Sequence, residues 1–357
     1  VAVCGLAAGP QARSAPDQAP ATHAVGWGLR LHWLALAFAP SSLLLAVTSH
    51  ITTDLASVPL LWVVPLSLYL LTFVIVFARR PVLRHAWMVK AQPFILIPLA
   101  LVFAHSSAFW LVLPLHLAAF FVTAMVCHGE LAQRRPATSH LTEFYLWMAF
   151  GGMLGGVFNA LLAPIAFDWV LEYPLALVVA CLLRPRLDQN RNGLLGNLGL
   201  PLIVLLLVLL QVQWRRLGLP ELGAAGALPL LVPIAMLLYS FAARPLRFGL
   251  GVAAVLSVAL LAGEPNQVQA RARSFFGVYT IKHDPAGYHF LVHGTTVHGA
   301  QHTDAAARME PLTYFHREGP LGQIFAALAD HPPARVGAVG LGVGTVACYR
   351  RPGQRWT

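Results

Sequence analysis

Up to about residue 262, the chain consists of long apolar runs separated by short polar segments. An α-helix needs about 20 mostly apolar residues to cross the hydrocarbon layer of a membrane. Nine runs reach or approach this length, and they lie near residues 31–48, 56–78, 88–104, 107–127, 141–163, 169–183, 196–214, 224–243 and 246–262. The sixth is short and contains Glu172 and Pro174. We therefore expect a mainly α-helical polytopic membrane domain over residues 31–262.

Small residues in the fifth run predict close helix packing. Gly151, Gly152, Gly155 and Gly156 form two overlapping patterns in which small residues are four positions apart. Such spacing lets the backbone of a neighbouring helix approach closely.

The pattern changes after the ninth run. Residues 263–273 are polar and predict a linker between the membrane domain and the C-terminal part of the chain. Aromatic and β-branched residues at 275–281 and 288–292 then predict two strands, joined by a turn at 284–287. This part of the chain is therefore expected to leave the membrane.

Three glycines at alternate positions follow a short apolar run near the end of the sequence. Residues 321–329 fit one amphipathic helix, residues 335–339 fit a strand, and Gly340, Gly342 and Gly344 precede a helix-compatible segment. A glycine turn before a helix lets the backbone approach a ligand, and the helix N-terminus favours an anionic or polar group. A glycine turn in an ordinary α/β unit explains the same residues without any ligand.

Composition indicates a membrane protein. Of the 357 residues, 57% are hydrophobic and 11% are charged, and the mean hydropathy is +0.67, which is too apolar for a soluble protein with a single core. The net charge of +10 comes without a dense basic patch, so no nucleic-acid partner is expected. Cys4, Cys127, Cys181 and Cys348 show no paired spacing, so neither a disulfide framework nor a zinc site is expected.

Basic residues are concentrated in four loops between the apolar runs. With nine spans these loops share one face of the membrane, which the positive-inside rule assigns to the cytoplasm. The same count places residues 263–357 on the opposite face. The basic residues are Arg79, Arg80, Arg84 and Lys90; Arg134 and Arg135; Arg184, Arg186 and Arg191; and Arg244 and Arg247.

Several short segments resemble a known enzyme family when they are taken together with the glycine turn. His-Gly-Thr-Thr at residues 293–296 lies in the hairpin pattern, and Tyr-Phe-His at 314–316 follows it. The apolar part contains Thr-Ser-His-Ile-Thr-Thr-Asp at 48–54, His-Gly-Glu-Leu-Ala at 128–132 and Leu-Thr-Glu-Phe-Tyr-Leu-Trp-Met at 141–148. From about residue 30 onward, the chain resembles spermidine synthase-like polyamine aminopropyltransferases fused behind a multi-helix membrane region.

This resemblance implies an incomplete α/β domain and a transferase activity. Residues 274–333 would form its β-hairpin part, and residues 334–357 would begin the Rossmann-like fold that methyltransferases and spermidine synthases share. The reaction would move an aminopropyl group from decarboxylated S-adenosylmethionine to putrescine or a similar amine, without a metal. The family pattern assigns Gly340, Gly342 and Gly344 to the nucleoside, and Gln301, Tyr314 and His316 to substrate positioning.

The chain departs from the family pattern at two positions. Val343 replaces an Asp of the glycine turn, which leaves open S-adenosylmethionine or a related thionucleoside as the donor. Val297 replaces a Gln, with Gln301 farther on, which leaves polyamine specificity open. The acidic residue for the ribose and the catalytic Asp are expected beyond Thr357. No catalytic residue is therefore assigned, and we expect a fragment or truncated product that is inactive by itself.

Carboxylates in or beside the apolar runs suggest an alternative function. An ionised group at the bilayer centre costs about 2.5–3.5 kcal/mol and therefore needs a partner or a purpose. Asp54, Glu130 and Glu143 are candidates to contact a polyamine cation, which would make the protein a polyamine carrier or binding protein without catalysis. A position at helix ends in the headgroup region explains them equally simply.

Histidines are frequent in the segment that follows the linker. His289 and His293 are an even number of residues apart and share one face of a strand. No carboxylate or cysteine completes a ligand set with them, so no metal is expected.

The expected location is the inner membrane, with several spans and with contact to the lipid bilayer. Residues 1–30 are expected to be the tail of a preceding segment followed by a linker. Residues 263–357 are expected in the cytoplasm, where nucleoside donors occur, which conflicts with the loop charges. A re-entrant segment 169–183, or one merged with its neighbour, would remove the conflict. A homo-oligomer is compatible with the sequence.

Overall fold

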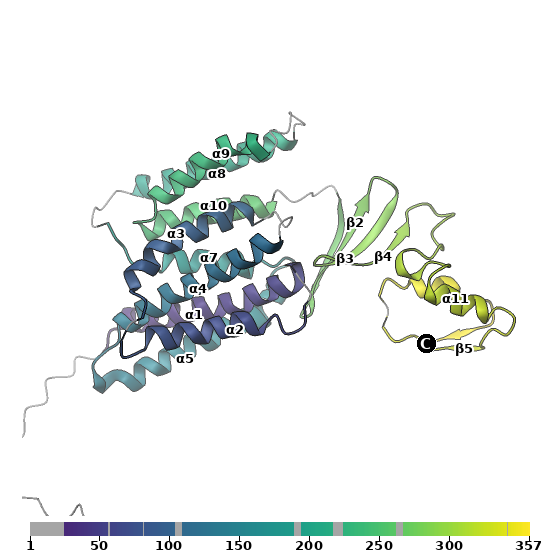
Figure 1. Ribbon diagram of the computed structural model, residues 1–357, viewed down its shortest axis with the longest axis horizontal. Coiled ribbons are helices and arrows are strands. Elements are labelled where there is room, and N and C mark those ends of the chain that lie inside the picture. Colours follow the sequence, from purple (N-terminus) through teal and green to yellow (C-terminus); the bar gives the residue numbers. More distant parts are fainter. Residues whose placement is uncertain are drawn as a thin grey trace, which may run out of the picture.

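The computed structural model describes residues 25–55, 58–80, 82–103, 109–188, 194–216, 224–261, 267–340 and 342–357. Helices run side by side in a bundle, a small sheet extends from one end of this bundle, and a C-terminal unit lies beyond the sheet (Figure 1). The parts therefore follow one another in space as they do in the sequence. We call the end of the bundle from which the sheet extends the sheet-side end.

Each of the nine apolar runs contains a helix. In the membrane hydrocarbon every backbone polar group must be bonded internally, and an α-helix achieves this within one segment. The helices are α1 Trp27–His50, α2 Val63–Val76, α3 His85–Val102, α4 Phe109–Gln133, α5 Leu141–Val157, α7 Glu172–Leu182, α8 Leu194–Arg216, α9 Ala224–Ser240 and α10 Pro245–Leu261. Because α1 begins at Trp27, it includes the end of the expected linker 1–30, most of which lies outside the described residues.

Four helical segments are long and apolar enough to cross a membrane, among the residues that the structure describes. They are Trp27–Leu55, His85–Val102, Trp110–Gln133 and Thr138–Ala166, and five shorter apolar helices accompany them. These segments indicate a multi-pass membrane protein, as composition predicts.

The sixth run forms a separate helix, α7, and is not merged with its neighbour. It packs against α1 and α10, and Tyr173, Leu177 and Cys181 are buried. Its first residue, Glu172, pairs with Arg273 of the sheet. Although its 11 residues extend only about 16 Å, α7 connects the sheet-side end to a basic loop at the other end.

Two of the long helices end in π-helical turns near the sheet. α1 continues into η1 (Ile51–Leu55), and α5 continues into η3 (Phe158–Leu162) and α6 (Ala163–Ala166). The sequence gives no periodicity signal for such turns, because they insert a single residue into an otherwise α-helical run.

Glycine permits the close packing of α5 on α1. A Cβ atom added to Gly151 would lie 2.3 Å from the carbonyl oxygen of Leu34, and one added to Gly155 would lie 2.6 Å from that of Phe38. A Cβ on Gly152 would meet nothing within 4 Å. One of the two overlapping small-residue patterns therefore forms the predicted helix contact.

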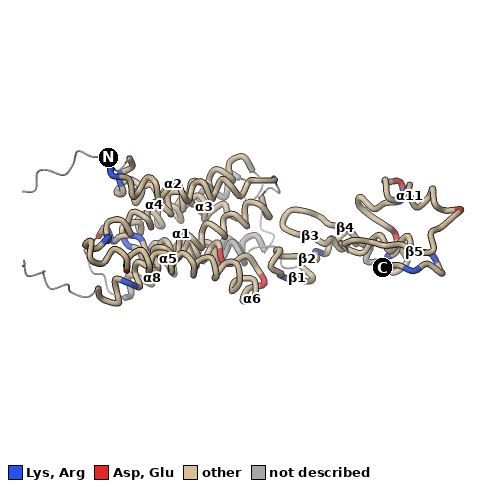
Figure 2. Tube along the Cα trace, turned by 90° about the horizontal axis from the view of Figure 1, so that it is seen from below, with Lys and Arg blue, Asp and Glu red and all other residues tan. Residues whose placement is uncertain are grey.

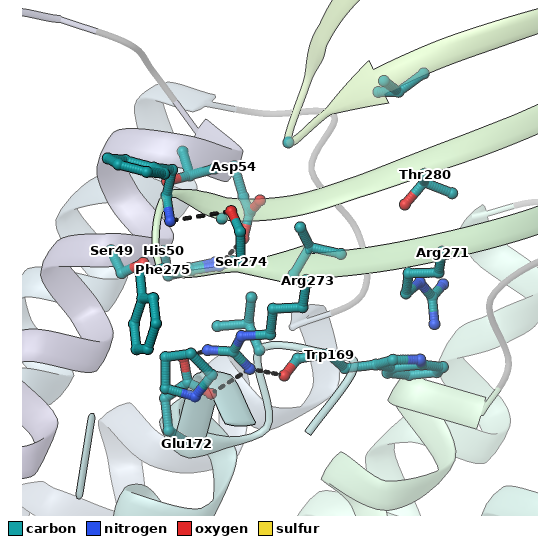
Figure 3. A pocket seen from close by; sticks show the side chains of 18 of the residues that line it. Ser49, His50, Asp54, Trp169, Glu172, Arg271, Arg273, Ser274, Phe275 and Thr280 are labelled. Carbon is teal, nitrogen blue, oxygen red and sulfur yellow. Dashed lines mark hydrogen bonds and ion pairs between the residues drawn. The ribbon is translucent and has the colours of Figure 1, made fainter. Parts of the chain in front are cut away.

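The sheet is an antiparallel meander of four strands. β1 Val268–Ser274, β2 Gly277–Asp284, β3 Tyr288–His293 and β4 Thr296–His302 pair in chain order. The two predicted strands are β2 and β3. The predicted linker 263–273 is wrong in its second half, since residues 268–273 belong to β1. Polar β1 residues are compatible with a strand because the strand pairs with β2 and extends its arginines toward the bundle (Figure 3).

The C-terminal unit is small and contains a parallel strand pair. It consists of η4 Thr313–Phe315, α11 Pro320–Ala327, β5 Arg335–Val336, η5 Thr345–Tyr349 and β6 Arg355–Trp356, with β5 parallel to β6. The sequence predicted a helix at 321–329, which α11 confirms, a strand at 335–339, of which β5 covers only the first two residues, and a further α-helix after the glycine turn. A five-residue 3-10 helix replaces that α-helix, because Pro352 and Gly353 follow closely. η5 is too short to provide the helix N-terminus expected to bind an anion.

The basic loops lie at the end of the bundle opposite to the sheet (Figure 2). This common location follows from the alternating direction of the helices and agrees with the nine-run pattern. Ion pairs cross-link this end, with Arg244 to Asp188 at 2.5 Å and Arg30 to Glu143 at 2.5 Å. Arg191 lies outside the described residues.

Candidate functional site

A cavity of about 560 Å³ lies between the sheet and the glycine turn. This volume is within the range of small-molecule sites. All four strands and the loop 308–310 contribute to its wall. We call it the glycine-corner cavity. Its lining residues are Gln269, Ala270, Ile281, His289, Phe290, Leu291, Gly299, Ala300, Gln301, Arg308, Met309, Glu310, Val343, Gly344, Thr345, Ala347 and Cys348.

Two glycines allow the turn to approach the sheet. Gly344 is in the left-handed conformation, with φ of 73°, and caps the N-terminal end of η5. A Cβ on Gly299 of β4 would lie 2.3 Å from the Val343 side chain, so only a residue without a side chain fits at position 299. Val343 therefore packs against the sheet as an apolar wall.

The three predicted nucleoside glycines occupy different positions. Gly344 lines the glycine-corner cavity. Gly340 and Gly342 have φ of 87° and 54°, and a Cβ on either would meet nothing within 4 Å. Glycine at 340 and 342 is thus required by the backbone conformation, whereas these two residues do not line the cavity.

The predicted substrate-positioning residues separate in the same way. Gln301 of β4 lines the glycine-corner cavity. Tyr314 is exposed, and its hydroxyl donates to the carbonyl oxygen of His298 at 2.7 Å. His316 lies against Gly319 at the start of α11. Tyr314 and His316 hold the connection between β4 and α11 and do not line the cavity.

The polar groups of the glycine-corner cavity are of both signs. Arg308 and Glu310 lie on the same short loop, and Glu310 is 3.7 Å from His302. Burial raises the pKa of the Cys348 thiol, and the charge of Arg317 lowers it to a smaller extent. The cavity therefore combines an apolar wall with a carboxylate, an amide and a neutral thiol.

The three membrane carboxylates do not converge on one site. Glu130 is 2% exposed and bonds to His85 at 2.8 Å and to Arg134 at 2.5 Å. Glu143 pairs with Arg30 at the same basic end of the bundle. Asp54 lies in η1 at the sheet-side end. Glu130 and Glu143 therefore neutralise neighbouring cations at their own end of the bundle.

Histidines of the sheet form pairs. The rings of His283 and His289 are 5.4 Å apart, and those of His293 and His298 are 5.9 Å apart. Within the described ranges, no group of three or more His, Cys, Asp or Glu residues is arranged to hold a metal ion.

Sequence reasoning missed two polar contributors at the sheet-side end. Asn159 lies in the π-helical turn η3, and Arg273 bonds to Glu172 across the boundary between sheet and bundle. The sequence marks Arg273 only as a charge after the last span, and nothing in the sequence marks Asn159.

Comparison with known proteins identifies no relative. No family model matches the chain, and no curated protein and no solved structure is significantly similar to it. The function of the protein is therefore inferred from its own residues and geometry.

Proposed function

We propose that the protein is a membrane-anchored aminopropyltransferase of the spermidine synthase type, and that the glycine-corner cavity receives the adenosine-bearing donor. The observation that carries this proposal is the cavity of about 560 Å³ beside Gly344 and Gln301. Gly344 and Gln301 are two of the residues that the sequence resemblance assigns to the reactants, and the size of the cavity suits a nucleoside. The helical bundle anchors this site to the bilayer.

The reaction requires a bound donor and a correctly aimed amine. The donor supplies a carbon attached to a sulfonium, so that a neutral amine forms the new C–N bond, the C–S bond breaks and the amine loses a proton. In the glycine-corner cavity, Gln301 and Glu310 offer oxygen atoms to a polyamine, and Phe290 and Leu291 offer apolar surface. These groups would bind and orient the two reactants.

The carrier alternative has less support. It needs carboxylates that face a common path, whereas Glu130 and Glu143 are paired with basic residues at one end of the bundle and Asp54 lies at the other. We therefore do not adopt it.

The transferase proposal places residues 267–357 in the cytoplasm, where nucleoside donors occur. The basic loops at the opposite end of the bundle favour the reverse orientation, because such loops are retained in the cytoplasm. Membrane topology is therefore a strict test of the proposal.

Binding by matched variants tests the proposed site. Ala347 lines the glycine-corner cavity and is exposed, so Ala347→Trp would fill the cavity without displacing a buried group. Ala327 of α11 is also exposed but does not line the cavity, so Ala327→Trp is the matched control. We expect Ala347→Trp to weaken binding of a thioether nucleoside at least about tenfold and Ala327→Trp to leave it unchanged. Equal binding by both variants would show that the nucleoside does not enter this cavity.

A further inference from the structure

A second cavity lies between the bundle and the sheet, away from the proposed transferase site. Its volume is about 1150 Å³. One wall comes from the sheet-side end of the bundle, and the other comes from β1 and β2 (Figure 3). We call it the junction cavity.

Two contacts between sheet and bundle fix its walls. Arg273 of β1 donates to both carboxylate oxygens of Glu172, at 2.6 and 3.1 Å, and to the carbonyl oxygen of Trp169. In the β3–β4 turn, Gly294 lies so close to η1 that an added Cβ would be 2.1 Å from the carbonyl oxygen of Thr53. The junction cavity is therefore a built feature held by a buried ion pair and by close backbone packing.

The acidic side chains of the junction cavity already have cationic or hydrogen-bonding partners. Asp54 bonds to the Nδ1 atom of His50 at 2.8 Å. Glu172 forms its two bonds with Arg273, and these two side chains are only 4% and 6% exposed. Neither carboxylate therefore leaves a strong uncompensated negative charge facing the cavity.

Two basic side chains of the junction cavity are not neutralised in this way. The guanidinium of Arg271 lies 4.4 Å from the ring centre of Trp169, and Lys282 is exposed on β2. Within the described part of the chain, neither forms an ion pair with a carboxylate. Burial lowers the pKa of Arg271, and the charge of Asp168 raises it to a smaller extent. Burial disfavours the charged form of the guanidinium, and an anion beside Arg271 would stabilise that form.

Apolar side chains face the same space. Leu45, Phe103 and Pro164 come from the bundle, and Phe275 and Phe276 come from the turn between β1 and β2. The two turn residues are 65% and 86% exposed. Their large apolar surface lies at the bundle, where hydrocarbon chains are available to cover it.

The floor of the junction cavity contains an unsatisfied hydrogen-bond acceptor. The amide nitrogen of Asn159 donates to Ser42 at 2.6 Å and to the Gly155 carbonyl oxygen at 3.1 Å. Its carbonyl oxygen is buried and has no partner among the described residues. Asn159 lies in η3 and Asp54 in η1, and π-helical turns are frequent at functional sites.

We propose that the junction cavity binds an anionic amphiphile: a lipid whose phosphate lies between Arg271 and Lys282 and whose hydrocarbon lies against Phe103 and Phe275. Phosphate matches the two available cations, and a hydrocarbon tail covers the apolar wall that a small polar anion would leave in water. The cavity lies at an end of the helical bundle, and the ends of membrane-spanning helices lie near the lipid headgroups.

Native mass spectrometry of the full chain in a neutral maltoside detergent tests this proposal. Three probes separate the contribution of the net negative charge from that of the hydrocarbon tail. They are phosphatidylglycerol, zwitterionic phosphatidylcholine and tail-free glycerol 3-phosphate. We expect saturable one-to-one binding of phosphatidylglycerol, binding of phosphatidylcholine about tenfold weaker, and no adduct with glycerol 3-phosphate.

Charge-removing variants locate the site. Arg271→Gln and Lys282→Gln should each weaken phosphatidylglycerol binding about tenfold, the effect of one lost charge-assisted contact. Lys282 is exposed, so its variant should fold normally. Arg350→Gln, an exposed position in the C-terminal unit, is the matched control and should bind like the unmodified chain.

Three results would overturn the proposal. Equal affinity for both phospholipids, or equal affinity of the Arg271 and Arg350 variants, would exclude an anion site at the junction cavity. Tight binding of glycerol 3-phosphate would show that a free phosphate ester is the ligand and that the apolar wall has another purpose.

Discussion

Gly299 and Gly344 shape the glycine-corner cavity for different physical reasons. Gly299 is needed for space, because any side chain there would meet Val343. Gly344 is needed for its left-handed backbone, which turns the chain into η5. The sequence identified Gly344, since alternate glycines are a recognisable pattern. It could not identify Gly299, because a close approach between residues far apart in the chain leaves no local signal.

Cys348 provides a residue-scale prediction at the same cavity. Only the thiolate reacts with an alkylating reagent, and burial raises the pKa of this thiol above its usual value near 9. In a Cys4→Ser chain, the alkylation rate of Cys348 should therefore be low at pH 7 and still rise with pH beyond pH 9. Peptide mapping of iodoacetamide adducts measures this rate. A rate that levels off below pH 9 would mean that the thiol is not shielded.

Element by element, the pattern of apolar runs located the helices well and their ends poorly. Length and hydropathy are enough to place a helix in each run, because backbone bonding in lipid has few alternatives. The turns η1 and η3 and the strand β1 were missed because they depend on tertiary contacts. The side chains of Asp54 and Asn159 reach the junction cavity through such turns, so this site could not be assembled from the sequence.

The contact between α1 and α5 gives a prediction at the scale of elements. Gly155→Leu should destabilise the bundle by about 1–3 kcal/mol, because the added side chain must displace the backbone of α1. Gly152→Leu adds the same side chain where a Cβ meets nothing within 4 Å, so it should change stability by less than about 0.5 kcal/mol. Thermal unfolding in detergent measures both. Similar losses for the two variants would contradict this packing of α5.

At the scale of the whole molecule, the sheet lies at one end and the basic loops lie at the other (Figure 2). Both cavities are lined by residues of the sheet and therefore lie at the sheet end. Neither cavity could be predicted as a volume, since each forms between segments that are distant in sequence. The order of membrane helices, sheet and C-terminal unit was predictable from the change of pattern after the ninth run. The arrangement makes orientation in the membrane decisive for function.

Thiol labelling determines that orientation. For the proposed transferase, a cysteine introduced by Arg350→Cys, at an exposed position of the C-terminal unit, should react with a membrane-impermeant maleimide only after cells are permeabilised. In intact cells it should remain unlabelled, whereas an Arg79→Cys variant, altered at an exposed position of the basic end, should be labelled. The opposite labelling pattern would place the sheet outside the cytoplasm, as the basic loops favour. The glycine-corner cavity would then have no access to a cytoplasmic nucleoside donor.

The central claim is that a nucleoside enters the glycine-corner cavity, and calorimetric titration of the purified full chain with a thioether nucleoside tests it most directly. We predict saturable binding at one site per chain that adenosine-free thioethers do not reproduce and that Ala347→Trp weakens at least about tenfold. A Kd of about 1 mM corresponds to a binding free energy of about −4 kcal/mol. Absence of binding to the unmodified chain at nucleoside concentrations up to about 1 mM would contradict the claim.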